Sequence, residues 1–217
     1  MNKRLQVIYS EIETCASFAD VGCDHGYIAK AVLDGEKCSN VVISDISAPS
    51  LKKAEKLLKK YIDCQKAKAV VCDGLKLVPE CETVLIAGMG GEEIIKIIKE
   101  SPFLPKKLIL SPMKNQDKVR FFLQNNGYGI VRDYTFSDER FYHVICAELG
   151  KETLPYTPLE YEFGRDNLIL RSQDFMAYIK KELEKAECFY DKVIADEDKK
   201  QFGETIKILK GILNEDK

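Results

Sequence analysis

The stretch DVGCDHG, residues 20–26, follows an apolar run from Cys15 to Ala19 and precedes a helix-like run from Tyr27 to Leu33. This pattern predicts a tight turn between a strand and a helix. Gly22 and Gly26 can adopt a positive φ, so the backbone can approach a ligand closely. The first N–H groups of the following helix are free to bind an anion. An ordinary turn built from glycine and aspartate is the alternative interpretation.

This turn differs from the dinucleotide fingerprint G-x-G-x-x-G, because it reads D-x-G-x-D-x-G. Asp24 adds a carboxylate where a pyrophosphate-binding loop has a small neutral residue. Two nearby carboxylates, Asp20 and Asp24, repel a pyrophosphate but suit a cationic cofactor that carries an amino acid. S-adenosylmethionine has this chemistry, so the turn favours it over a dinucleotide.

The composition is that of a globular protein, with 217 residues, 45% hydrophobic and 31% charged. We expect one large domain, or one of about 150 residues with a smaller partner. No apolar run approaches the roughly 20 residues that cross a bilayer, and the N-terminus does not resemble a signal peptide. We therefore expect no membrane contact. The eight cysteines include no C-x-x-C pair, which favours reduced thiols in a cytoplasmic protein without a metal site.

Strand-like and helix-like segments alternate up to about residue 150. We expect a leading helix with a stripe from Leu5 to Ile12, strands over 16–21, 40–44, 67–72, 83–87 and 107–110, and helices over 27–33, 49–61, 92–100 and 118–125. Two further strands, 128–136 and 140–149, follow without a helix between them. The alternation predicts a mostly parallel sheet covered on both faces, and the last pair an antiparallel edge hairpin. This α/β fold is the Rossmann-like architecture of class I methyltransferases, which differs from the ordinary dinucleotide-binding fold.

The sequence changes character after Gly150. Residues 153–158 contain two prolines and predict a linker. Apolar residues then recur with heptad-like spacing in two sets, which predicts an antiparallel helical hairpin, coiled-coil-like, with the charged stretch 196–200 as its turn. The sets are Met176, Ile179, Leu183, Ala186, Tyr190 and Val193, and then Phe202, Ile206, Leu209 and Leu213. We favour packing of this stripe within the chain over an oligomerisation motif, and we therefore expect a monomer.

Acidic residues or glycines follow four of the five expected parallel strands, at the edge where open sheets of this kind bind ligands. The turn at 20–26 follows the first strand, Asp45 the second, Asp73 the third and the glycine-rich segment 88–91 the fourth. Asp45 is placed to accept hydrogen bonds from two ribose hydroxyls and Asp73 from an adenine amino group. Each aspartate alone can be a turn residue, but their coincidence on one edge favours a cofactor site.

Several motifs together resemble the TrmK family, the bacterial tRNA (adenine-22-N1)-methyltransferases. The most distinctive are ADVGCDHGY at 19–27 and AGMGG at 87–91, and the match also includes Arg4-Leu5, DGL at 73–75, LSP at 110–112 with Arg120 after it, Phe141-Tyr142 and EFG at 162–164. The resemblance covers almost the whole chain. It implies an S-adenosylmethionine-binding catalytic domain at 1–152 and a C-terminal helical domain at 153–217. The implied cofactor-binding residues are Asp20, Gly22, Asp24, His25, Gly26, Tyr27, Asp45, Ile46, Asp73, Gly74, Ala87, Gly88, Met89 and Gly90.

The chain departs from the family after the fifth strand, where members often have Gln-Pro-Asn and this chain has SPMKN at 111–115. We expect Ser111, Pro112 and Asn115 to shape the pocket for the target base. Asp24 is expected either to hold the amino group of the cofactor or to act at the base. His25 is favoured as a turn-stabilising residue over a general base, because the neutral N1 of adenine has no proton to remove.

The reaction implied by the resemblance is methyl transfer from S-adenosylmethionine to N1 of an adenine in tRNA, at position 22. N1 lies on the Watson–Crick edge, so the base must be unpaired or flipped into the pocket. The net charge is −2, so RNA binding requires a local basic patch. We expect phosphate contacts from Arg4, Lys114, Lys118 and Arg120. A lysine cluster at 52–60 is either an RNA surface or a solvated helix face.

Two alternatives remain open from the sequence. A methyltransferase acting on a small molecule would share the cofactor site, and it would not need basic groups around the pocket. A non-catalytic relative that binds RNA or a protein partner is kept open by the altered segment at 111–115.

Overall fold

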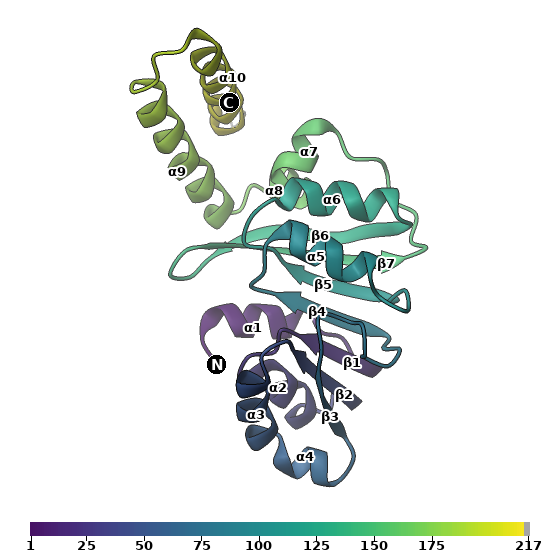
Figure 1. Cartoon of the computed structure of the whole chain (residues 1–217). Helices are drawn as coiled ribbons and strands as arrows, with labels where there is room; N and C mark the ends of the chain where they lie inside the picture. The colour runs from purple at the N-terminus through teal and green to yellow at the C-terminus, as the bar shows by residue number, and fades with distance from the viewer. Residues whose placement is uncertain (215–217) are drawn as a thin grey trace.

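The computed structural model describes residues 1–214 and contains a seven-stranded sheet in the order β3-β2-β1-β4-β5-β7-β6 (Figure 1). Strands β1 to β5 run parallel to one another, and β7 pairs antiparallel with both β5 and β6. The predicted fold class is therefore confirmed, including the antiparallel edge. The strands are β1 (Cys15–Val21), β2 (Cys38–Asp45), β3 (Ala67–Val71), β4 (Thr83–Ala87), β5 (Lys107–Ser111), β6 (Tyr128–Ser137) and β7 (Phe141–Leu149).

Helices cover both faces of this sheet, as the buried strands require. The helices α1 (Lys3–Ser10), α2 (Tyr27–Asp34) and α3 (Ala48–Leu57) share one apolar cluster with Leu85 of β4. The helices α5 (Gly91–Lys99) and α6 (Gln116–Asn125) share the other with Ile86. Successive side chains of a strand point to opposite faces, so β4 is buried from both sides.

The single helix expected over 49–61 is divided into α3 and a short α4 (Lys59–Asp63). Leu58 between them is fully buried, and its backbone leaves helical geometry with φ −96° and ψ 8°. The Tyr61 N–H donates to the carbonyl oxygen of Leu58 at 2.8 Å, which is the tighter i to i+3 spacing of a 3₁₀ turn.

Between β7 and residue 214 the structure contains four helices, α7 (Pro158–Phe163), α8 (Arg165–Leu170), α9 (Gln173–Tyr190) and α10 (Asp196–Asn214). The last two form the predicted helical hairpin, which extends away from the sheet (Figure 1). Its interior contains Phe175, Ile179, Ala186, Leu209 and Ile212. No helix among residues 1–214 has the length and apolar character that a membrane crossing requires.

The expected turn of this hairpin at 196–200 was wrong, because residues 191–195 make the connection and Val193 lies in it. Asp196, Glu197 and Asp198 instead occupy the first turn of α10. Acidic side chains are stabilised there by the free N–H groups of the helix, so this charged stretch begins a helix.

A buried ion pair joins α6 to β6 and to the segment before α8. Arg120 has no exposed surface, and its Nε donates to both carboxylate oxygens of Asp133, at 2.8 and 3.1 Å. Its Nη1 donates to the carbonyl oxygens of Tyr161 and Glu162, at 2.9 and 3.0 Å. The expected contact of Arg120 with RNA phosphates is therefore wrong for this structure, because the guanidinium is inside the protein with its donors occupied.

Candidate active site

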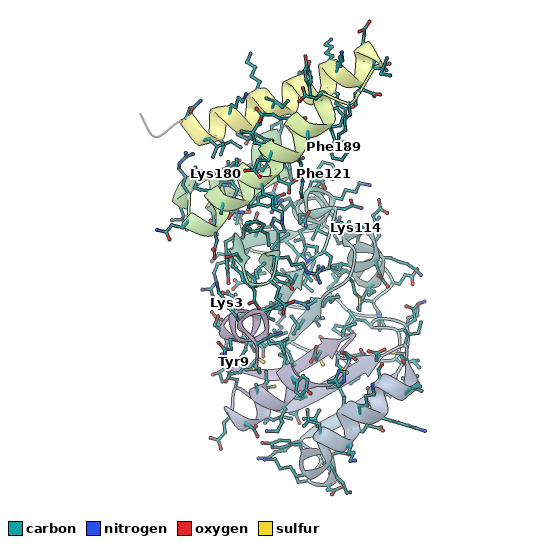
Figure 2. The ribbon with its side chains drawn as sticks, turned by 90° about the vertical axis from the view of Figure 1, so that its left-hand side faces the viewer. Lys3, Tyr9, Lys114, Phe121, Lys180 and Phe189 are labelled. Carbon is teal, nitrogen blue, oxygen red and sulfur yellow. The ribbon has the colours of Figure 1, made fainter. Side chains whose placement is uncertain are left out.

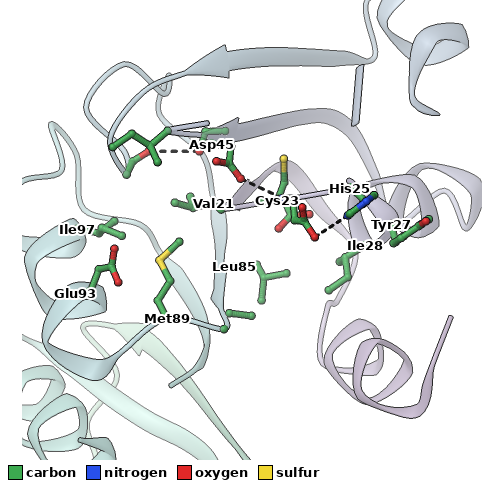
Figure 3. Close-up of a pocket in the computed structure, with 18 of the residues that line it drawn as sticks. Val21, Cys23, His25, Tyr27, Ile28, Asp45, Leu85, Met89, Glu93 and Ile97 are labelled. Carbon is green, nitrogen blue, oxygen red and sulfur yellow. Dashed lines mark hydrogen bonds and ion pairs between the residues drawn. The ribbon is translucent and has the colours of Figure 1, made fainter. Parts of the chain in front are cut away.

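A cavity of about 540 Å³ opens at the carboxyl ends of β1, β2 and β4 (Figure 3). This volume is typical of sites for small molecules and cofactors. All the predicted cofactor residues except Gly26 and Gly90 line it. Gly26 instead begins α2, where a Cβ would lie 2.9 Å from the Cβ of Ala54, so it permits helix packing. Asn2, Cys23 and Glu93 also line the cavity and had not been expected.

The turn at 20–26 is tight and is tied to β2. The N–H groups of Gly22 and Cys23 donate to the carbonyl oxygen of Ser44 at 2.8 and 3.1 Å. Gly22 has φ +69°, and a Cβ there would lie 2.2 Å from Cε of Met89. Glycine at this position therefore serves both the left-handed backbone and the close approach of the segment after β4.

Two carboxylates lie at the inner end of the cavity. Asp20 is buried, and this burial, together with the negative charge of Asp45, raises the pKa of its carboxyl to about 7. Asp45 accepts a hydrogen bond from the backbone N–H of Asp24 at 3.2 Å and another from Ser47 at 2.8 Å. The carboxylates are therefore held in place in a region that a cation would stabilise.

The stacked rings of His25 and Tyr27 line the mouth of the cavity. Oδ2 of Asp24 lies 2.6 Å from Nδ1 of His25, and the His25 ring stacks on Tyr27 with centroids 5.6 Å apart and planes inclined by 4°. The ring of Tyr27 is half exposed. These contacts hold the His25 ring between its neighbours in the turn.

Arg4 lies in the cavity wall and is half-buried. Its guanidinium carbon is 5.1 Å from the ring centre of Tyr142, and its Nη2 is 3.0 Å from the point where a Cβ of Gly88 would stand. Its Nε is buried and has no hydrogen-bond partner. An unsatisfied buried donor in a site indicates a place for an acceptor on a ligand.

The sequence contained a signal for the position of Arg4. Residues four apart lie on the same face of a helix, so Arg4 shares a face with Ile8, which is fully buried. Residues three apart also share a helix face, so Arg120 lies on the same face as Leu123, which is fully buried.

The expected base-pocket residues do not line the cavity; they lie in the segment after β5, which is joined to the segment 88–91. Ser111 is buried at the end of β5, and its hydroxyl has no hydrogen-bond partner. Pro112 is also buried. Asn115 has φ +57° and begins α6. The two segments are joined by backbone hydrogen bonds from Met113 to the Met89 carbonyl and from Gly91 to the Lys114 carbonyl, both 2.9 Å.

The remaining predicted residues occupy separate places. Lys118 is exposed on α6 and paired with Glu92. Asp73 lies at the cavity rim, where an ion pair with Lys76, 2.6 Å between Oδ2 and Nζ, lowers the pKa of its carboxyl. Among residues 1–214 no group of three or more histidine, cysteine, aspartate or glutamate side chains is arranged to hold a metal ion.

Comparison with known proteins places these features among methyltransferases. The family model described as a methyltransferase domain matches residues 1–145. The tRNA (adenine(22)-N(1))-methyltransferase of Bacillus subtilis is 25% identical over 219 residues, covering 96% of this chain and 92% of that protein.

Solved structures give the same result for the fold. A Streptococcus pneumoniae structure in complex with S-adenosyl-L-methionine has a TM-score of 0.87 at 25% identity, covering 99% of this chain and 100% of that one. The Bacillus subtilis tRNA methyltransferase TrmK has a TM-score of 0.86 at 22% identity, covering 99% of each chain.

Proposed function

This chain belongs to the methyltransferase domain family, and from that premise we propose that it transfers the methyl group of S-adenosyl-L-methionine to N1 of an adenine in tRNA. The observation that carries the proposal is the cavity in which Asp20, Asp45 and Arg4 meet at the carboxyl edge of the sheet. The choice of tRNA, and of adenine 22 within it, is supported by the Bacillus subtilis relative, which matches over 96% of this chain.

The residues of the cavity fit the chemical groups of this cofactor. Asp45 can accept from ribose hydroxyls, and the carboxyl of Asp20 complements an ammonium. The unpartnered Nε of Arg4 complements a carboxylate. Ile46, with 73% of its surface exposed, and the buried Ile97 offer apolar contacts to adenine. When bound, the cofactor supplies an electrophilic methyl group on a sulfonium.

Positioning is the main task of the protein in this reaction. The N1 atom of adenine is neutral and carries a free lone pair once the base is unpaired, so no general base is required. The half-exposed ring of Tyr27, held by His25, offers a flat surface on which an unpaired base can stack. Alignment of the reacting atoms on such a surface provides the larger part of the rate enhancement.

Charge stabilisation is the second task, because positive charge develops on the base as the methyl group arrives. The carboxylate of Asp24 is exposed beside the cavity mouth and can accept a hydrogen bond from the exocyclic amine, which strengthens in the transition state. Asn115 lies outside this cavity and lines the neighbouring groove, so its part in shaping the base pocket stays a prediction. The burial of Ser111 and Pro112 supports a role in positioning the segment 88–91.

The test of this function is a methylation assay with mapping of the product. The full-length protein is incubated with labelled S-adenosyl-L-methionine and an unmodified tRNA transcript, and the RNA is digested to nucleosides. We expect N1-methyladenosine, and its loss when adenine 22 is replaced by guanine. Asp45→Ala should abolish both cofactor binding and product, whereas Asp63→Ala, an exposed aspartate on α4, should retain both. Cofactor binding without N1-methyladenosine would contradict the proposal and favour a small-molecule substrate or a non-catalytic role.

We further propose that the enzyme acts in the cytoplasm as a monomer, with its catalytic domain at 1–152 and its helical domain at 153–217. All eight cysteines are free thiols, which agrees with a reducing compartment. The apolar stripe of α9 and α10 is buried largely within its own hairpin, so it does not require a second copy of the chain.

A further inference from the structure

A second groove, of about 350 Å³, lies between the loop before α6, the tip of the β6–β7 hairpin and α9. We propose that this groove binds the backbone phosphates of the RNA strand next to the methylated nucleotide. The proposal rests on the proposed function and adds a site to it. Figure 2 views the molecule from this side, with Lys114 beside the sheet and α9 above it.

The groove is basic in a protein whose net charge is negative. Its lining residues include four cations, Lys114, Arg140, Lys181 and Lys185, and one acid, Glu182, whereas the whole chain has a net charge of −2. Glu182 is paired with Lys185 at 2.6 Å. The ammonium of Lys181 lies 5.5 Å from the ring centre of Phe141, and the guanidinium of Arg140 lies 5.3 Å from that of Tyr142. Three cations therefore remain available to phosphates.

Aromatic rings make up the wall between these cations. Tyr178 meets Phe141 edge to face with ring centres 5.5 Å apart, and meets His143 in the same way at 5.1 Å. His143 is held by Thr135 at 3.1 Å. Burial, with the nearby charge of Arg120, lowers the pKa of the His143 imidazole to about 3, so the ring is neutral. Cations interleaved with aromatic rings are typical of sites for single-stranded nucleic acid.

The groove and the cofactor cavity lie on either side of two hydrogen-bonded segments, 88–91 and 111–115. Met89 lines the cavity and Met113 lines the groove, and the N–H of Met113 donates to the carbonyl of Met89 at 2.9 Å. Lys114 reaches back over the same segment, with its Cε 3.1 Å from the point where a Cβ of Gly90 would stand. An RNA strand whose base enters the cavity therefore meets the groove at the adjoining nucleotides. This proximity to the cofactor cavity favours RNA over an acidic peptide.

The two walls of the groove are held in fixed positions. The backbone N–H of Ser137 in the hairpin donates to Asp174 of α9 at 3.0 Å, and the Ser137 hydroxyl donates to the same carboxylate. The Arg120–Asp133 pair holds α6 against β6 on the other side. A site organised before binding loses less entropy when the ligand arrives.

The test compares two pairs of lysines in the full-length protein. The groove variant is Lys114→Gln with Lys181→Gln, which removes two of the three available cations, and the matched control is Lys52→Gln with Lys56→Gln, from the exposed lysine cluster on α3. Affinity for an unmodified tRNA transcript is measured by fluorescence anisotropy from about 50 to about 200 mM KCl. We expect the groove variant to lose roughly tenfold in affinity and about 1.5 units of salt slope. Its KM for tRNA should rise while kcat and the cofactor Kd stay unchanged, and the control should match the wild type.

Each outcome decides the proposal. Wild-type affinity and salt slope in the groove variant would overturn it, as would loss of binding in the α3 control alone. Suppose that a poly-glutamate peptide displaces a single-stranded RNA from the wild-type protein and binds the groove more tightly than the RNA does. This result would overturn the proposal in favour of an acidic protein partner. Groove-dependent tRNA binding without any N1-methyladenosine would support the groove and contradict only the proposed function.

Discussion

The raised pKa of Asp20 predicts that the affinity for S-adenosyl-L-methionine depends on pH. In the ligand-free protein, burial and the charge of Asp45 bring the pKa of this carboxyl to about 7, so it is mostly protonated below pH 7. A cationic cofactor favours the ionised form. Binding should therefore release a proton, and the affinity should fall as the pH drops below 7.

The size of this effect follows from the fraction of Asp20 that is ionised before binding. With a pKa of about 7, about half of the carboxyl is ionised at pH 7 and roughly one eleventh at pH 6. The affinity should therefore weaken about fivefold over this unit, which is about 1 kcal/mol of binding free energy. The α-amino group of the cofactor, with an ordinary pKa of about 7.7 to 8.0, stays protonated in this window.

Isothermal titration calorimetry measures both the affinity and the protons released. Titrations at several pH values between 6 and 7, in two buffers of different ionisation enthalpy, give the proton count directly. Asp20→Asn keeps the shape of the side chain and should remove the slope, while His25→Gln at the cavity mouth should retain it. A wild-type affinity that is constant over this range, or a slope that persists in Asp20→Asn, would refute the reasoning.

Three further predictions concern stability and loop geometry. The pKa of Asp20 in the folded protein lies above its ordinary 3.8, so the free energy of unfolding of the ligand-free wild type should fall as the pH rises from about 4 to about 7. Asp20→Asn should not show this fall and should be more stable than the wild type at pH 8 by on the order of 2 kcal/mol. Urea denaturation at both ends of the pH range measures the two free energies. Gly91→Ala places a Cβ 2.4 Å from the carbonyl oxygen of Asn115, so it should lower kcat in the methylation assay with the cofactor Kd nearly unchanged, whereas Gly211→Ala, with open space around it, should change neither. Arg120→Met leaves the Asp133 carboxylate buried without its partner and should cost about 3 to 5 kcal/mol in chemical denaturation; a loss below about 1 kcal/mol would show that water reaches the pair.

The architecture was accessible from the sequence because its signals are local. Runs of apolar residues with strand or helix spacing predicted the alternation, and the hairpin after residue 128 predicted the antiparallel edge. The acids and glycines after the strands converge because the carboxyl ends of parallel strands meet on one edge. Nearly all the predicted cofactor residues therefore line one cavity.

The errors concern side chains whose position depends on partners distant in sequence. Arg120 was expected to contact RNA phosphates, but it is buried, where it donates hydrogen bonds to Asp133 and to the carbonyl of Tyr161. Arg4 lies in the cavity wall because α1 packs its face onto the sheet, and its contact with RNA phosphates stays a prediction. Ser111 and Asn115 lie outside the cavity because the segment 111–115 packs against the segment 88–91. The spacing of apolar residues in the sequence does not predict how two such loops pack.

The buried contacts of Arg120 with Asp133, Tyr161 and Glu162 also decide where this chain can be joined to a related one in a hybrid protein. For a hybrid that takes its helical hairpin from a relative, the obvious joining point is the proline-containing segment 153–158. Joining there would exchange Tyr156, Tyr161 and Glu162 for residues of the relative. Arg120 and Asp133 would then lose the partners with which they are buried. Joining the two parents between α8 and α9 keeps these contacts within one parent. With Asp174 and Tyr178 retained against the β6–β7 hairpin, the rest of α9 and α10 becomes an exchangeable arm that can be varied without disturbing the methyl-donor site.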